Sequence, residues 1–535
     1  MIRFIPFVVT IIFAVASVFA VMLVSSWFWL AAAPLIALSL LGLWDIAQPT
    51  HSILRNYPVI GHLRFMAEAI RPEIQQYFIE TDIGSRPYSR DERSLIYNRA
   101  KGGEGLSPFG TERDVDQPGY AWMEHSLAAH AITDSNFRVS VGNDSCTQPY
   151  NCSLLNVSSM SYGAISPNAI RALNRGAKLG GFAHWTGEGG LSDYHLENGG
   201  DICWQIGTGY FGCRTGDGGF DPDKFKQAAA HPAVKMIEIK LSQGAKPGHG
   251  GVLPAAKVTQ EISRVRGVAM GEDCVSPPGH SAFSTPKGLC EFVARLRDLS
   301  DGKPVGFKLC IGSPVEFMAV CKAMIETGIV PDFITVDGGE GGTGAAPVEF
   351  PDFVGMPLMP ALAFVHQILR GAGLRDRTKI AASGRVHLAA SVVSCMALGA
   401  DWCNAARAFM MSVGCLQTRK CHTNKCPVGV ATQDPVRQRA LNVGDKAQRA
   451  FQFHKNTLTA LAELIGAMGI DHPGEITPSM VMRRESFGKF TKLSTEIPPI
   501  DTGALVAGHA PELWQFGWNR ATPDSFHPVP LERSA

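Results

Sequence analysis

The chain has 535 residues, with 49 Lys and Arg against 48 Asp and Glu, so its formal net charge is +1. This length allows a large core and more than one domain, and the balanced charge gives no electrostatic reason to expect a nucleic-acid partner. A total of 56 glycines and 34 prolines favours a loop-rich α/β enzyme whose backbone approaches a ligand closely.

The first 48 residues are predicted to form a transmembrane helical hairpin. Two uncharged apolar runs, 4–24 and 27–44, are each long enough to cross a bilayer, and tryptophans at both ends of the second run resemble interfacial anchors. A signal peptide is the alternative, but the apolar block is too long and lacks a small-residue cleavage site before a polar start. Arginines flank the hairpin on both sides, at Arg3, Arg55 and Arg64. Under the positive-inside rule, they predict a multi-pass protein of the cell membrane whose catalytic domain is cytoplasmic.

The rest of the chain is predicted to contain a barrel between two extensions. Residues 49–150 form a mixed N-terminal extension without a chemical motif, residues 151–440 the barrel, and residues 441–535 a C-terminal helical and irregular extension. Eight candidate strands alternate with helix-length segments: 154–160, 181–187, 203–209, 234–240, 304–310, 332–338, 379–384 and 401–407. This alternation over about 250 residues predicts a (β/α)8 TIM barrel. A doubly wound sheet would alternate in the same way, but the strand number and the lack of an early GxGxxG favour the barrel.

The predicted strands end in polar or Gly-rich segments, where barrels place their chemistry. "DGGEGGTGAAP" at 337–347 supplies several backbone N–H groups, and the loops after strands seven and eight often hold a phosphate. A phosphorylated cofactor is therefore expected, with tight turns that need Gly as the alternative. Lys240 and Lys308 fall at strand ends, and Lys308 suits the cation that a flavin needs near its N1–C2=O edge; a salt-bridged barrel lysine is the alternative.

Two further side chains, Glu188 and Lys246, lie in Gly-flanked loops where they could bind or protonate a substrate carboxylate or imine. His249, in the same loop as Lys246, is expected to be a solvated residue.

Most of the 13 cysteines are scattered singly, often within apolar runs, as in a reducing compartment. Three of them share the loop "CLQTRKCHTNKCPVG" after the eighth strand: Cys415, Cys421 and Cys426. Three thiolates followed by Pro suit a cuboidal iron–sulfur cluster in which each of three irons takes one thiolate. A zinc site with His422 as fourth ligand and a loop without metal are the alternatives.

Taken together, these stretches resemble the FMN-binding synthase domain of glutamate synthase. "SSMSYGAISPNAIRALNRGAKLGG", "TGEGG", "KLSQGAKPGHGG", "DGGEGGTGAAP" and "CLQTRKCHTNKCPVGVATQDP" occur in the family's order and at family-like separations, over residues 154–435. The resemblance implies a barrel that binds FMN and a [3Fe-4S] cluster held by Cys415, Cys421 and Cys426. It also implies an oxidoreductase acting on CH–NH2 donors in glutamate biosynthesis. The family's reaction reduces 2-iminoglutarate, formed from 2-oxoglutarate and ammonia, to L-glutamate with hydride from FMN.

The resemblance also implies roles for single residues. Glu188 and Lys246 would be catalytic, and Ser161, Gln243 and Arg266 would bind the substrate. The residues implied to bind FMN are Ser159, Met160, Gly163, Lys308, Gly341, Gly342, Thr343, Ser383, Gly384 and Arg385.

The chain also departs from the family's pattern. It has neither the cysteine-led glutaminase domain nor the long β-helical domain, so free ammonia or ammonia from a separate amidotransferase is expected. The family reads "GEGGQLPG" where this chain reads "GHGGVLPA", so His249 replaces an acid and Val252 an amide that would contact the substrate. The alternatives are therefore an FMN and iron–sulfur oxidoreductase acting on another imine or amine, similar to N-methylglutamate synthase, or an electron-transfer subunit. Since no NAD(P)H fingerprint is visible, a ferredoxin or a separate reductase is the expected electron donor.

Overall fold

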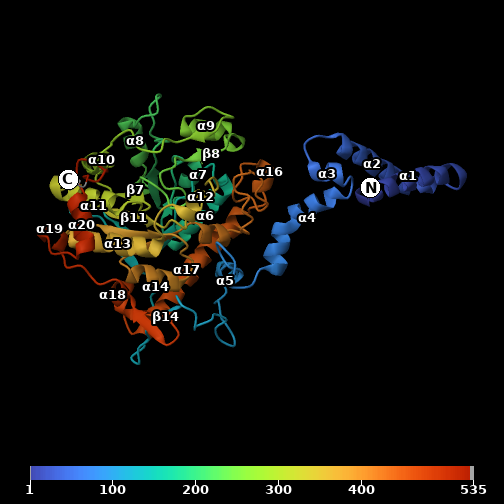
Figure 1. Ribbon diagram of the computed structural model, residues 1–535. Helices are drawn as coiled ribbons and strands as arrows, with labels where there is room; N and C mark the ends of the chain where they lie inside the picture. Colours follow the sequence, from blue (N-terminus) through green and yellow to red (C-terminus); the bar gives the residue numbers. More distant parts are fainter. Residues whose placement is uncertain (1, 531–535) are drawn as a thin grey trace, which may run out of the picture. The chain divides into compact units, whose positions relative to one another are not determined.

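The computed structural model describes residues 2–530, which form two compact units that divide between Arg90 and Asp91 (Figure 1). The first unit begins with α1 (Ile5–Leu23) and α2 (Trp29–Ala47), which pack against each other. Their connection is a turn, η2 (Ser26–Phe28). Gly42 allows the close approach, because a Cβ there would overlap the ring of Phe7. Two apolar N-terminal helices are thus present, and both are long and apolar enough to cross a membrane.

After the hairpin, the first unit continues through α3 (Ser52–Asn56) into α4 (Gly61–Ile74). A π-helical turn, η3 (Gln75–Ile79), prolongs α4 without interruption.

The second unit is built around a closed barrel of eight parallel strands, which confirms the predicted fold class. Each strand lies within or overlaps one of the eight candidate strands: β4 (Leu155–Val157), β5 (His184–Trp185), β6 (Ile202–Ile206), β7 (Val234–Lys240), β10 (Val305–Leu309), β11 (Phe333–Asp337), β12 (Lys379–Ser383) and β13 (Trp402–Ala405). The strands are almost wholly buried on both faces, as a barrel wall covered by helices requires.

Helices follow the barrel strands in turn: α6 (Pro167–Gly180), α7 (Asp193–Leu196), α8 (Pro222–Ala229), α10 (Pro286–Leu299), α11 (Pro314–Thr327), α13 (Leu358–Gly371), α14 (Ala389–Ala397) and α15 (Arg407–Ser412). Several begin with a polar cap before a proline. In α6, Ser166 accepts the N–H of Ala169, Pro167 takes the first helical position, and Gly181 ends the helix in the left-handed conformation. These local signals make the strand–helix alternation readable from the sequence.

Further elements complete the second unit. The helix α17 (Val443–Met468) packs on α6, where Gly176 lets the two backbones approach. Around the barrel lie α5 (Arg90–Ala100), α9 (Gln260–Arg266), α12 (Glu349–Phe353), α16 (Pro435–Gln438), α18 (Leu493–Glu496), α19 (Ala504–Ala507) and α20 (Glu512–Arg520). Three small sheets lie outside it: β1 (Ala121–Met123) with β14 (Val481–Ser486) and β15 (Lys489–Lys492), β2 (Arg138–Val141) with β3 (Tyr150–Ser153), and β8 (Val252–Leu253) with β9 (Cys274–Val275).

Candidate active site at the barrel mouth

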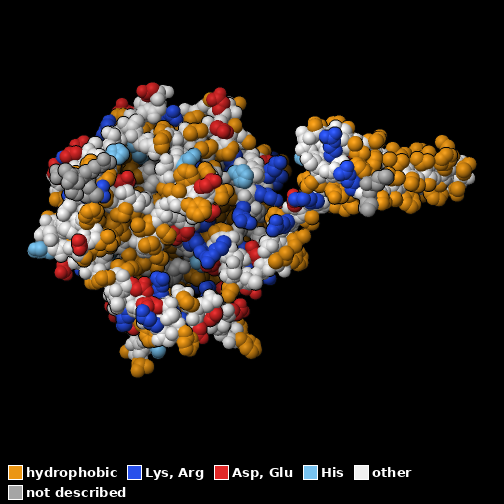
Figure 2. All heavy atoms as spheres, viewed as in Figure 1, with side chains coloured by type: hydrophobic (Ala, Val, Ile, Leu, Met, Phe, Trp, Pro, Cys, Tyr) orange, Lys and Arg blue, Asp and Glu red, His pale blue; other side chains and the backbone are white. Residues whose placement is uncertain are grey.

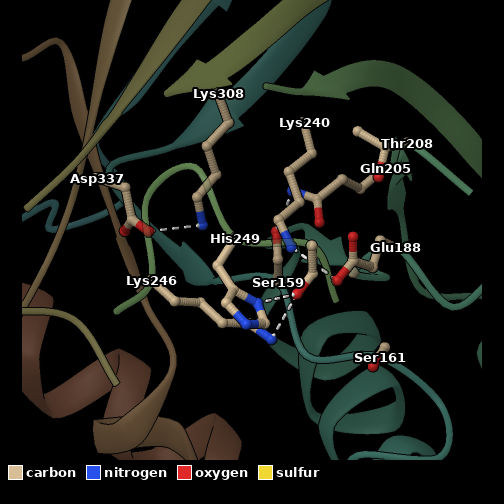
Figure 3. A network of polar contacts seen from close by, with 12 residues as sticks. Ser159, Ser161, Glu188, Gln205, Thr208, Lys240, Lys246, His249, Lys308 and Asp337 are labelled. Carbon is tan, nitrogen blue, oxygen red and sulfur yellow. Dashed lines mark hydrogen bonds and ion pairs between the residues drawn. The ribbon is translucent and has the colours of Figure 1, made fainter. Parts of the chain in front are cut away.

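Charged side chains from four barrel strands and their loops converge at the carboxyl end of the barrel (Figure 3). Glu188 follows β5, Lys240 ends β7, Lys308 lies near the end of β10 and Asp337 ends β11. Because the carboxyl ends of parallel barrel strands meet at one mouth, residues spread over 150 positions of sequence become neighbours. The mouth is therefore the candidate active site.

Glu188, predicted to be catalytic, forms an ion pair of 2.8 Å with the Nζ of Lys240. Burial acts to raise the pKa of the Glu188 carboxyl, but the ammonium of Lys240, with Arg266 and Lys246 beyond it, outweighs burial, and the pKa falls below its ordinary value. Two glycines enclose this carboxylate: a Cβ on Gly207 would lie 2.7 Å from Oε2, and one on Gly251 2.5 Å from Oε1. Glu188 is thus an ionised carboxylate, and it fits beside Gly207 and Gly251 because neither residue has a side chain.

Lys308, predicted to hold the flavin, is buried and pairs with Asp337, with 3.2 Å between Nζ and Oδ2. The same carboxylate oxygen accepts the backbone N–H of Gly244 at 2.8 Å. Asp337 therefore joins the loop after β7 to the end of β11 and fixes the position of the lysine. The sequence-based interpretation did not include Asp337; its place at the end of a strand, at the head of a Gly-rich loop, was the available signal.

Two predicted substrate-side cations, Lys246 and Arg266, are also buried at the mouth. The Nζ of Lys246 donates to the carbonyl of Gly250 at 2.9 Å, and burial lowers the pKa of this lysine from its usual 10.5. Arg266, the last residue of α9, donates to the carbonyl of Tyr162 at 2.8 Å and stacks over Phe211 at 5.1 Å. Within residues 2–530 neither cation forms an ion pair with a carboxylate, and the Nε of Arg266 has no hydrogen-bond partner.

The segment after β4 brings further predicted residues to the same place. The hydroxyl of Ser161 lies 3.5 Å from Nη2 of Arg266, and a Cβ on Gly163 would lie 3.2 Å from the same nitrogen. Met160 is buried, and Ser159 accepts a hydrogen bond of 2.8 Å from Gln205. Among the other substrate-side residues, Gln243 accepts the backbone N–H of Lys246 through its carbonyl at 3.2 Å.

A buried carboxylate below the mouth was missed by the sequence-based interpretation. Glu238 accepts hydrogen bonds from Gln205 at 2.6 Å, from Trp185 at 3.1 Å and from Thr335 at 2.5 Å. Desolvation raises its pKa, and nearby Lys308 acts in the opposite direction. The strand period could have indicated it, because Glu238 lies two residues before Lys240 and so on the same face of β7.

The predicted FMN loops meet beside these lysines. A Cβ on Gly341 would lie 3.2 Å from the nitrogen of Ala245, and one on Gly342 would lie 3.2 Å from Nη1 of Arg407, at the start of α15. After β12, the Ser383 hydroxyl lies 3.3 Å from that of Ser158, and Gly384 and Arg385 both have positive φ, +150° and +46°. Thr343 is exposed. A Cβ on Gly384 would lie 3.4 Å from the nitrogen of Gly338, so the loops after β7, β11 and β12 approach one another through small residues. Uncovered backbone of this kind suits a phosphorylated cofactor.

The three cysteines of the predicted cluster loop lie close enough to influence one another. Burial raises the pKa of Cys415 to about 12, with further raising effects from Cys421 and Cys426. Burial also raises the pKa of Cys421, and the buried ammonium of Lys257, near Cys421 and Cys426, acts in the opposite direction without outweighing it. Among the described residues, no three His, Cys, Asp or Glu gather closely enough for a single metal ion.

Residues of the N-terminal extension touch both predicted cofactor loops, although the sequence showed no motif there. Glu92 of α5 pairs with Arg385 at 3.1 Å and lies 3.1 Å from Nε2 of His387. From the same helix, the hydroxyl of Tyr97 donates to the carbonyl of Cys415 at 2.7 Å. No local pattern could have indicated these contacts, because they join positions about 300 residues apart.

Residues 133–471 match the conserved region in glutamate synthase, which is more than half of the chain. The chain belongs to the glutamate synthase family. It is 38% identical over 507 residues to the "Glutamate synthase large subunit-like protein YerD" of Bacillus subtilis, covering 87% of this chain and 96% of that protein. It is 36% identical over 313 residues to the "Archaeal-type glutamate synthase [NADPH]" of Thermotoga neapolitana, where the match spans 58% of each protein.

Among solved structures, a mutant flavocytochrome b2 with pyruvate bound aligns at 14% identity and a TM-score of 0.40, over 83% of this chain and 90% of that one. The match to the glutamate synthase region includes every predicted site residue, from Ser159 to Cys426, and excludes the first unit.

Proposed function

We propose that this chain is an FMN- and [3Fe-4S]-dependent oxidoreductase of the glutamate synthase type that reduces 2-iminoglutarate to L-glutamate. Membership of the family supports the oxidoreductase class. The observation that supports an anionic substrate is an excess of buried positive charge: Lys240, Lys246 and Arg266 all act on the single carboxylate of Glu188, which pairs directly with Lys240. Buried charge that is not fully compensated is costly, so a bound dicarboxylate would balance Lys246 and Arg266.

The residues present fit the proposed cofactor. Lys308, the Gly341–Gly342 turn and the Ser383–Arg385 turn would hold FMN at the mouth, where the glycines leave the backbone uncovered. When bound there, FMN supplies the hydride for the reduction.

The chain's own residues would position the substrate and move the proton. Arg266 would bind a carboxylate through its planar guanidinium. Lys246 would give a proton to the imine nitrogen, since its lowered pKa makes it a better acid than an exposed lysine. Glu188 is ionised, so it would accept hydrogen bonds from the nitrogen of the substrate rather than donate a proton.

The cluster proposal rests on the donor set. Cys415, Cys421 and Cys426 offer three thiols in one loop, next to the buried cation Lys257, whose charge offsets part of the rise that burial causes in the pKa of Cys421. Electrons would come from a separate protein such as a ferredoxin or a reductase subunit, and ammonia from solution or a separate amidotransferase.

The proposed site of action is the membrane. The helices α1 and α2 would anchor the chain to the cell membrane and leave the catalytic unit in the cytoplasm. Their length and composition support this proposal.

One measurement tests the proposed reaction. The detergent-purified, cofactor-replete protein would be given a chemical reductant, 2-oxoglutarate and 15N-ammonium, with methylammonium and glutamine as alternative nitrogen sources. We expect 15N-glutamate from ammonium and no turnover with glutamine. Reoxidation of the flavin by none of the three would contradict the glutamate assignment.

A second candidate substrate follows from Val252. This residue directly follows Gly251, which lies against the Glu188 carboxylate, and its side chain is aliphatic and half-buried. An apolar side chain here would favour an N-alkylated amine over ammonia, so N-methylglutamate from methylammonium in the same assay would support this candidate.

A further inference from the structure

The segment after the hairpin carries an apolar stripe that no described residue of the first unit covers. With 100° per residue, Leu63, Met66, Ile70, Ile74 and Tyr77 fall on one side of the continuous helix formed by α4 and η3. Their exposed fractions are 60%, 62%, 52%, 38% and 54%, and Phe78 beside them is 84% exposed. A contiguous apolar patch of this kind marks an interaction surface.

Charged and polar residues lie beside the stripe, although Phe65 and Ile79 are exposed on the opposite side. Glu68 and Gln75 are exposed away from the stripe, and Arg64 and Arg71 lie along one border of it. Arg64 pairs with Glu68 at 2.9 Å. An apolar face bordered by arginines is typical of helices that lie in the membrane–water interface, where long basic side chains reach the phosphates.

Hydrogen bonds fix the connection between α4 and the hairpin. Asp45, buried in the last turn of α2, accepts the backbone N–H of Val59 at 2.9 Å and lies 2.9 Å from Nε2 of His62. Gln48 binds the backbone of Asp45 and His51 through its amide nitrogen, at 2.9 and 3.0 Å. These bonds fix the start of α4 to the end of α2, and α4 leaves the hairpin at an angle rather than continuing its line (Figure 1).

We propose that the helix 61–79 lies in the interface of the same membrane that the hairpin enters, with the stripe in the acyl region. This inference rests on the proposed membrane anchor. The hairpin is covered by apolar side chains (Figure 2), and a helix fixed to its end is held where the bilayer surface begins. The stripe is therefore expected to contact the membrane rather than a second copy of the chain, because the hairpin holds it at the bilayer surface.

The test uses the full-length protein in phosphatidylcholine nanodiscs that contain a lipid with a diazirine near the top of its acyl chain. After irradiation, tandem mass spectrometry locates the lipid adducts. We expect adducts on the hairpin and on Met66, Ile70 and Tyr77, and none on Glu68 or Gln75. The double variant M66D/I70D should lose most adducts on 61–79 and keep those on the hairpin, whereas the matched control Q75D should keep both sets.

The outcomes separate this inference from the anchor on which it rests. Adducts on the hairpin without any on the stripe would overturn the interfacial helix and leave the anchor standing. Cross-links from the stripe to a second copy, in place of lipid adducts, would overturn it in favour of a dimer. A lack of adducts on both segments would overturn the anchor together with the inference.

Discussion

Replacing Gly251 with Ala should impair catalysis by displacing Glu188. The new Cβ would lie 2.5 Å from Oε1 of Glu188 and 3.2 Å from the hydroxyl of Ser276, so the carboxylate would have to retreat by about 0.9 Å to reach an ordinary contact of 3.4 Å. On the other side, Oε2 of Glu188 already occupies the space where a Cβ on Gly207 would lie, 2.7 Å away. Because Oε1 is also the atom that pairs with Lys240 at 2.8 Å, its displacement should disturb this ion pair.

The size of the effect follows from this overpacking. Forcing an extra methyl group into a filled site costs about 1–3 kcal/mol, which corresponds to roughly a 5- to 150-fold loss of kcat/KM if the whole cost falls on the transition state. Stability should change little, because most of the adjustment is confined to one side chain at the mouth.

Steady-state kinetics with the chemical reductant would measure the loss, and Gly279→Ala is the matched control, because a Cβ there meets no atom within 4 Å. Combining G251A with Glu188→Asp, which shortens the carboxylate by one methylene, should recover part of the rate lost in G251A. If G251A and G279A had the same kcat/KM as the natural chain, the inferred confinement of Glu188 would be wrong.

Three other predictions follow from the contacts. The rate should fall as pH rises through the lowered pKa of Lys246, because the ammonium that donates the proton is then lost. Lys246→Arg should lower the rate and remove this descending limb, because a guanidinium keeps its charge but does not give up a proton; an unchanged rate and limb would exclude Lys246 as the acid. Cys421→Ser should abolish the iron signal in electron paramagnetic resonance and keep the flavin absorbance, and retained iron would argue against this ligand. Arg297→Met leaves the fully buried Asp332 without its 2.9 Å partner and should lower the free energy of unfolding by about 3–5 kcal/mol, measured by urea titration; an unchanged midpoint would refute the assigned pair.

The order of the barrel strands could be read from the sequence because each strand carries its own local signal. Apolar runs such as those of β7 and β11 are followed by glycines, and helices such as α6 begin with a capping residue and a proline. These signals act over a few residues, so they can be recognised without knowledge of the tertiary structure. The hairpin was equally visible, since an uncharged run of membrane length needs no partner to be recognised.

The partners of the site residues could not be read in this way. The sequence placed Lys308 at a strand end, but only the closed barrel brings Asp337 to it, and only the packing of α5 brings Glu92 to Arg385. The stripe on 61–79 is periodic in the sequence, yet only the structure shows that it is uncovered.

By itself, then, the sequence determined the barrel, the positions of its loops, the motifs of the family and the apolar hairpin. The tertiary structure decided which charges form ion pairs, as Lys308 does with Asp337, and which form none among the described residues, as with Lys246 and Arg266. The reason is physical: strand and helix formation depend on neighbours in the chain, whereas the free energy of a buried charge depends on groups that only the fold brings within a few ångströms.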